Sequence, residues 1–175
     1  ENCSFETGNL DGWSVFDSPD PFHPVSVERA GLSPGYGFFS SRPTDGQFAL
    51  VTGFDSSIPY LIGIGRELQL PSSSAIILSF DYRAAWDMLT YGGPTSLPRR
   101  FTVDVWSQNF ELLRSTVVLT ASPENQTPDT GELSGQVDLS EFAGQTIFLE
   151  FNWDIPESQT GPGFFQLDNI AIQVQ

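Results

Sequence analysis

The sequence predicts an all-β protein built as an antiparallel β-sandwich of about nine to eleven strands. The chain contains 16 Gly and 13 Pro, and it shows hardly any sustained helical periodicity. Short runs that alternate apolar and polar residues recur between turn-forming stretches, as expected for half-buried strands. A length of 175 residues is typical of one domain, so residues 1–175 are predicted to share a single core.

The strands follow from apolar alternation, and their ends from the Gly- and Pro-rich stretches between them. Residues 18–24 contain three prolines and are therefore predicted to form a loop, and long loops are expected at 32–46 and 87–100. Residues 136–145 are expected to form a turn with one helical turn. The expected strands are residues 3–6, 13–17, 24–30, 47–54, 66–71, 75–86, 101–108, 111–121, 146–155 and 164–175.

Charge excludes one class of partner. Twenty-two acidic residues face seven arginines and no lysine, which gives a formal net charge of −15. Such a surface repels phosphate backbones, so nucleic-acid binding is not expected. It is compatible with divalent cations and neutral ligands. No run of 18 apolar residues is present, so we expect no membrane insertion.

The closing strand raises a specific question. Ile170, Ile172 and Val174 alternate onto one face, and the same period places Asp168 on that apolar face. An unpaired carboxylate in a core costs several kcal/mol. Either a cation lies beside Asp168, or the alternation breaks before this residue.

Five stretches occur in an order that resembles a known architecture: "CSFETGNLDGW", "DGQFALVTG", "LSFDYRAAW", "VDLSEFAGQTIFLEFNWD" and "GFFQLDNIAI". They resemble jelly-roll β-sandwiches of carbohydrate-binding modules similar to families 4, 6 and 22, and of MAM-like adhesion domains. The resemblance implies a jelly roll that is a non-catalytic, secreted or extracellular module. It also allows other domains in a larger secreted protein.

The same resemblance implies a structural calcium ion that ties the first strand to the last. Its side-chain ligands would be Glu6, Asp45 and Asp168, with backbone carbonyls near Ser4 and Phe48. Calcium prefers six to eight oxygen ligands, which agrees with this set. The alternative is that Asp168 caps a turn or pairs with an arginine such as Arg42.

A candidate ligand face follows from alternation in residues 78–83, 101–106 and 147–152. Each segment has an apolar inner set and an outer set that contains charge. If the three strands are neighbours, their outer residues share one sheet surface, on which carboxylates and an amide beside an indole suit sugars. The alternative is a solvated face with cross-strand ion pairs. The candidate carbohydrate-binding residues are Asp81, Arg83, Asp104, Trp106, Glu150 and Asn152.

Three further aromatic residues lie near expected strand ends, where they could contact a ligand: Trp86, Tyr91 and Trp153. The single histidine, His23, lies between prolines with no nucleophile motif around it, which argues against a catalytic triad or a histidine-rich metal site. The sequence therefore predicts a calcium-stabilised module that binds a polysaccharide or glycan without catalysis. An adhesion or surface-assembly domain that binds protein is the alternative, and a glycan-active enzyme is the third possibility.

Overall fold

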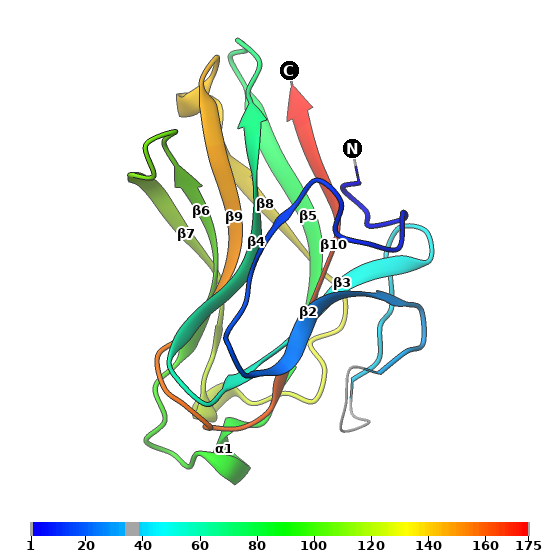
Figure 1. Cartoon of the computed structure of the whole chain (residues 1–175), viewed down its shortest axis with the longest axis vertical. Helices are drawn as coiled ribbons and strands as arrows, with labels where there is room; N and C mark the ends of the chain where they lie inside the picture. Colours follow the sequence, from blue (N-terminus) through cyan, green and yellow to red (C-terminus); the bar gives the residue numbers. More distant parts are fainter. Residues whose placement is uncertain (1, 34–38, 175) are drawn as a thin grey trace.

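The computed structural model describes residues 2–33 and 39–174, and it is nearly all β-structure (Figure 1). Residues 34–38, within the expected loop 32–46, lie outside the described residues. The ten strands are β1 Ser14–Phe16, β2 Pro21–Arg29, β3 Phe48–Ser56, β4 Tyr60–Gln69, β5 Ile76–Trp86, β6 Arg99–Trp106, β7 Leu112–Ala121, β8 Leu133–Asp138, β9 Thr146–Ile155 and β10 Gly163–Val174. One short α-helix, α1 (Met88–Tyr91), follows β5, and two single-turn 3-10 helices, η1 (Pro123–Asn125) and η2 (Ser140–Phe142), follow β7 and β8.

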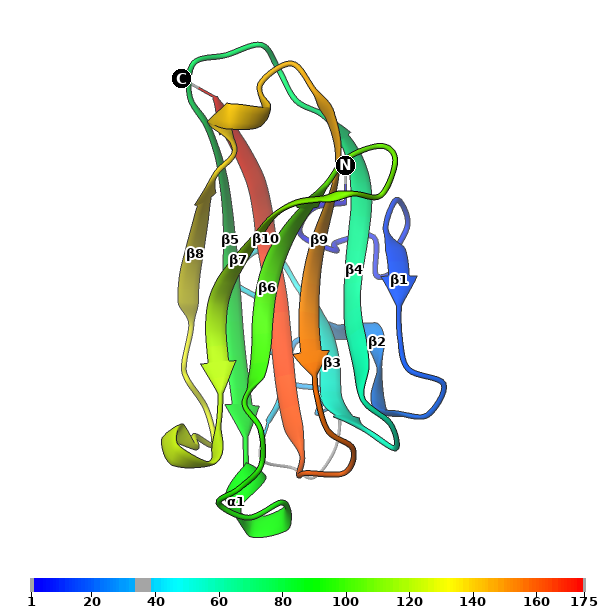
Figure 2. The same ribbon diagram turned by 90° about the vertical axis from the view of Figure 1, so that its left-hand side faces the viewer.

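The strands form two five-stranded antiparallel sheets, which confirms the predicted antiparallel sandwich of about nine to eleven strands. Sheet A has the order β1-β4-β9-β6-β7, and sheet B has the order β2-β3-β10-β5-β8. Figure 2 shows sheet A in front of sheet B, with α1 at one end of the sandwich. The described residues contain no helix long and apolar enough to span a membrane.

Alternation along each strand builds the core between the two sheets. Phe101, Val103 and Val105 of β6 are all buried, because every second side chain of the strand points towards sheet B. Phe54 of β3 stacks on Trp153 of β9 with ring centroids 4.3 Å apart. Trp153 is therefore a core residue, not a rim contact.

Four expectations about strands were wrong. The strand expected at 66–71 is β4, which begins six residues earlier, at Tyr60. Residues 3–6 form turns rather than a strand, and Phe5 has a positive φ of 57°. The proline-rich stretch 21–24 is the beginning of β2, which tolerates proline because it is an edge strand. Residues 133–138 form β8, the edge strand paired with β5, where a polar loop and the beginning of a turn were expected. The helical turn expected within 136–145 is present at Ser140–Phe142.

The alternation in β10 breaks at Asn169, one residue after Asp168. Asn169 has φ of 49°, and the pairing with β5 shifts register between Asp168 and Ala171. This bulge inserts an extra residue, so Leu167 and Ile170 both pack in the core although they are three residues apart. The predicted phase of Asp168 was wrong, because its side chain lies on the outer side of sheet B.

A polypeptide segment covers that outer side. Residues 39–45 lie across β10 and β5: Phe39 stacks on Phe164, with ring centroids 5.8 Å apart. The main chain of Arg42 donates to and accepts from the side-chain amide of Gln166, at 2.8 and 2.7 Å. Asp168 is completely buried under this segment even though it faces away from the core.

Candidate functional site

Four of the six predicted ligand residues lie together on the outer surface of sheet A. Asp104 and Trp106 belong to β6, and Glu150 and Asn152 belong to the neighbouring strand β9. Asp104 is paired directly with Glu150. Their strand neighbours point into the core, so these four side chains point away from sheet B. The outer face of sheet A is turned to the viewer in Figure 2.

The four side chains form one hydrogen-bonded group. The indole nitrogen of Trp106 donates to Glu150 at 2.6 Å. The amide nitrogen of Asn152 donates to both Asp104 and Glu150, each at 3.0 Å. Asp104, Glu150 and Asn152 are buried, whereas Trp106 is partly exposed. The buried polar side chains therefore fix the orientation of the partly exposed indole.

Two glycines of β4 make room for this group. A Cβ atom on Gly63 would come within 2.5 Å of the side-chain oxygen of Asn152. A Cβ atom on Gly65 would come within 2.5 Å of the Phe148 ring and 2.8 Å of Glu150. A Cβ atom on Gly63 would also come within 2.1 Å of the main-chain oxygen of Phe151, so a larger residue at either position would displace the backbone or the side chains of β9.

Aromatic residues continue the surface beside Trp106. Phe148 of β9 is paired with Trp106. Its ring centroid is 6.3 Å from that of Phe16 and 6.1 Å from that of Phe110, which is 72% exposed. These three phenylalanines were not among the residues predicted to contact a ligand. For Phe148 the signal was available, because it alternates with Glu150 on the outer side.

Asp81 and Arg83 do not belong to this surface, because β5 lies in sheet B. Arg83 is 2% exposed; two of its nitrogens donate to the Asp129 carboxylate at 2.7 and 2.6 Å, and a third donates to the Ser40 carbonyl. Hydrogen bonding from Arg83 to the Asp129 carboxylate lowers the pKa of Asp129 below its ordinary value. Asp81 accepts hydrogen bonds from Ser134 and Asn169. Both residues tie loops and strands to sheet B.

The residues predicted to bind calcium are neighbours in space. Ser4, Glu6 and Asp45 line one surface hollow. The Glu6 carboxylate accepts the main-chain N–H groups of Gln47 and Phe48 at 2.8–3.0 Å, so Phe48 contributes its amide rather than the predicted carbonyl. In this arrangement Glu6 fastens the N-terminal turns to the beginning of β3.

Asp168 is likewise surrounded by donors. Its carboxylate accepts the main-chain N–H groups of Thr44, Asp45 and Asn169 at 2.8–3.1 Å. Burial raises the pKa of Asp168 above its ordinary value, and these amides oppose that shift. No group of three or more acidic, histidine or cysteine side chains within residues 2–33 and 39–174 could hold a metal. In this arrangement the carboxylates of Glu6 and Asp168 both accept main-chain amides, so the calcium ion stays a prediction.

A second concave surface lies at the α1 end of the sandwich. It is a hollow of about 460 Å³ between the connections that follow β5, β7 and β9. The residues that line it are Trp86, Asp87, Thr90, Tyr91, Gln126, Thr127, Pro128 and Pro162. Trp86 and Tyr91 were predicted as possible ligand contacts, whereas residues 126–128 were not expected to lie beside them.

Comparison with known proteins gives a fold but no sequence family. No protein-family model matches the chain, and no curated protein matches it. Among solved structures, the carbohydrate-binding module TmCBM61, in complex with β-1,4-galactotriose, is similar with a TM-score of 0.62 and 15% identity over 100% of this chain and 97% of that chain. The xylan-binding domain CBM22-2 of Paenibacillus barcinonensis Xyn10C has a TM-score of 0.52 and 16% identity, over 99% and 98% of the two chains.

Two other neighbours have different roles. The K1 cleaved adhesin domain of Lys-gingipain from Porphyromonas gingivalis W83 has a TM-score of 0.56 and 17% identity, over 98% of this chain and 96% of that one. The enzymatically active domain of bacteriophage CBA120 tailspike protein 4 has a TM-score of 0.53, but only 21% of that chain is covered. At these identities the likeness shows the fold: the chain has the jelly-roll β-sandwich architecture found in carbohydrate-binding modules and in this adhesin domain.

Proposed function

We propose that this protein is a non-catalytic carbohydrate-binding module that holds its glycan on the outer surface of sheet A. The observation that carries the proposal is the Trp106 indole, partly exposed and held by a 2.6 Å hydrogen bond to Glu150. A ring held in one orientation loses little freedom when it packs against the C–H face of a sugar. Phe148 and Phe110 extend this aromatic surface along the sheet.

Charge on the same surface favours a neutral glycan. By alternation, Glu67 and Asp154 point to the same side of sheet A as Asp104 and Glu150, and Arg100 is the basic residue among them. Such a surface repels uronic acids and sulfated sugars. Galactan and xylan oligosaccharides are the first ligands to test, because two proteins of similar fold were solved with galactotriose or described as xylan-binding.

The test is isothermal titration with β-1,4-galactotriose and xylotriose. We expect Trp106→Ala to weaken binding at least about fivefold, and Trp106→Phe to retain part of the affinity, because a ring remains. Melting curves would show that both variants are folded. Binding that is unchanged in folded Trp106→Ala would refute the proposed surface.

The absence of catalysis is part of the proposal. Asp104 and Glu150 share one amide donor, Asn152, and neither is arranged as a separate acid and base. His23 lies on β2 of the other sheet, where it contacts Ser26 at 3.1 Å. Release of reducing ends from galactan or xylan, lost in Asp104→Asn or Glu150→Gln, would overturn this part.

Protein adhesion is the second candidate, and one observation favours it. The β6–β7 hairpin and the edge strand β7 expose Phe110, Leu112, Leu113 and Val117, each by at least 45%. An adhesion domain would bind a protein through such an apolar edge. Leu113→Glu would then abolish binding to a panel of extracellular proteins without affecting the titrations with sugars.

We also propose, as separate points, that the module acts outside the cell and that calcium binds in the hollow formed by Ser4, Glu6 and Asp45. The oxygens that line this hollow support calcium, whereas the amides already bound to Glu6 oppose it. Calcium at 100 times its Kd would add about 2.7 kcal/mol to the free energy of unfolding. A melting temperature that is the same in calcium and in chelator would exclude a stabilising ion.

A further inference from the structure

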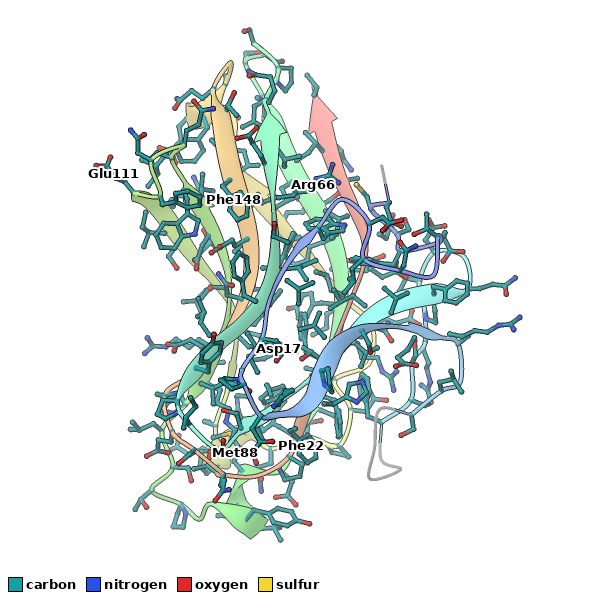
Figure 3. The ribbon with its side chains drawn as sticks, viewed as in Figure 1. Asp17, Phe22, Arg66, Met88, Glu111 and Phe148 are labelled. Atoms are coloured by element: carbon teal, nitrogen blue, oxygen red, sulfur yellow. The ribbon has the colours of Figure 1, made fainter. Side chains whose placement is uncertain are left out.

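We infer that the hollow at the α1 end is a second binding site, for a short neutral saccharide, separate from the surface of sheet A. The two sites lie at different places on the molecule. Figure 3 shows Phe148, on the sheet A surface, towards one end of the sandwich, and Met88 of α1 at the other end.

The floor of the hollow is held rigidly. Trp86 is 3% exposed, and its indole nitrogen donates to the Ser122 carbonyl at 3.2 Å. Its main-chain N–H donates to the Thr127 carbonyl at 2.8 Å, which joins two of the three connections. The N–H of Asp87 donates to the carbonyl of Pro162 at 3.0 Å, which adds the third. Because these bonds cross-link the connections, the hollow exists before any ligand binds.

One wall is an exposed aromatic ring. Tyr91 ends α1 and is 61% exposed, although it lines a concave surface. An exposed ring beside a buried indole provides the apolar contact that the C–H face of a sugar requires. A volume of about 460 Å³ is within the range of sites for small molecules, roughly 300–1,000 Å³.

The polar groups of the hollow match hydroxyl groups. Gln126 accepts the N–H of Leu89 at 2.6 Å through its side-chain oxygen, which leaves its NH₂ group to donate to a ligand. Asp87 accepts the N–H of Thr90 through one carboxylate oxygen, which leaves the other oxygen to accept. A sugar hydroxyl can both donate and accept, so it can use both groups.

Charge restricts the ligand further. Asp87 is the only charged side chain among the described residues that line the hollow. An anionic sugar would find a carboxylate and no cation, so uronic acids should be rejected. The ligand class is therefore a neutral mono-, di- or trisaccharide.

Nitrogen-15 NMR can separate the two sites in one titration, because the chain has four tryptophans. The intact protein is titrated with xylotriose, with β-1,4-galactotriose and, as an acidic comparison, with trigalacturonate. Binding in the hollow shifts the indole signal of Trp86 and the side-chain NH₂ signals of Gln126. Binding to sheet A shifts the indole signal of Trp106.

Three variants make the test specific. Tyr91→Ala should lower the affinity obtained from the titration of the Trp86 signal at least about fivefold, and Tyr91→Phe should leave that affinity within about twofold. Gln126→Glu keeps the acceptor for the N–H of Leu89 but removes the NH₂ donor, so it should also lower the affinity for the saccharide. Tyr60→Ala removes another exposed tyrosine, outside the hollow, and serves as the matched control that should change nothing.

The outcomes distinguish the two proposals. Neutral sugars that shift Trp106 but never Trp86 or Gln126 would overturn the second site and leave the proposed surface of sheet A intact. Shifts of Trp86 that Tyr91→Ala abolishes, without shifts of Trp106, would support the hollow and refute the sheet A surface. Equal shifts with trigalacturonate would refute the charge argument.

Discussion

Replacing Asp168 by alanine tests whether amides or a cation stabilise the end of the chain. Asp168 is completely buried, and its carboxylate accepts three main-chain N–H groups, those of Thr44, Asp45 and Asn169. Alanine would leave all three donors without their acceptor. An unsatisfied buried donor costs about 1–3 kcal/mol.

The lower end of that range applies here. Thr44, Asp45 and Asn169 are themselves exposed, so water can reach their amides once the carboxylate is gone. Taking about 1 kcal/mol for each amide gives a loss of about 3 kcal/mol. For a chain of 175 residues this corresponds to a decrease in melting temperature of about 6–12 °C.

The assay is thermal unfolding followed by circular dichroism, in calcium and in chelator. Asp45→Ala is the matched control, because the Asp45 side chain is exposed and accepts no hydrogen bond among the described residues. In chelator we expect Asp168→Ala to melt about 6–12 °C lower and Asp45→Ala to melt like the unaltered protein. A loss of less than about 1 kcal/mol for Asp168→Ala in chelator would refute the hydrogen-bonding account. A loss for Asp45→Ala that appears only in calcium would support the ion.

Two further predictions concern buried arginines. Because the hydrogen bond from Arg83 lowers the pKa of Asp129, this carboxylate contributes stability above its ordinary value of 3.8, and the contribution is lost as the pH falls through its folded-state pKa. Asp129→Asn should therefore be less stable than the unaltered protein at neutral pH and converge with it in acid; parallel urea curves from pH 7 to 2.5 would contradict this. Arg99 is fully buried, donates to the carbonyls of Phe54 and Gly161, and pairs with Asp55 at 3.2 Å. Arg99→Ala should cost about 3–5 kcal/mol in urea unfolding, because it leaves a largely buried carboxylate unpaired; a cost below about 1 kcal/mol would contradict this.

Local sequence patterns were sufficient for most of the strands and for the side on which most of their residues lie. The period of two placed Phe101, Val103 and Val105 inside, and Asp104 and Trp106 outside, and the structure confirms this. The reason is that successive side chains of a strand point to opposite faces of the sheet, so the direction follows from the local order of residues. The glycines, the prolines and the missing helical period indicated the β-sandwich for the same local reason.

The pattern failed where the backbone departs from ideal geometry. Asn169 adopts a positive φ, and this one bulge reverses the phase of Asp168 relative to Ile170. Asparagine is among the residues that tolerate this conformation, but many asparagines do not adopt it, so the sequence does not reveal the bulge. Proline in β2 is tolerated for a reason equally absent from the local sequence, which is that the strand is at an edge.

By itself, the sequence determined the all-β class, the acidic surface and the outward direction of Asp104, Trp106, Glu150 and Asn152. Only the tertiary structure decided which strands are neighbours: β6 pairs with β9, whereas β5 pairs with β10 and β8 in the other sheet. Strand order depends on pairing between residues far apart in the chain, such as Leu50 of β3 with Leu167 of β10. Such contacts leave no periodic signal in a single sequence, and for that reason Asp81 and Arg83 were assigned to the wrong surface.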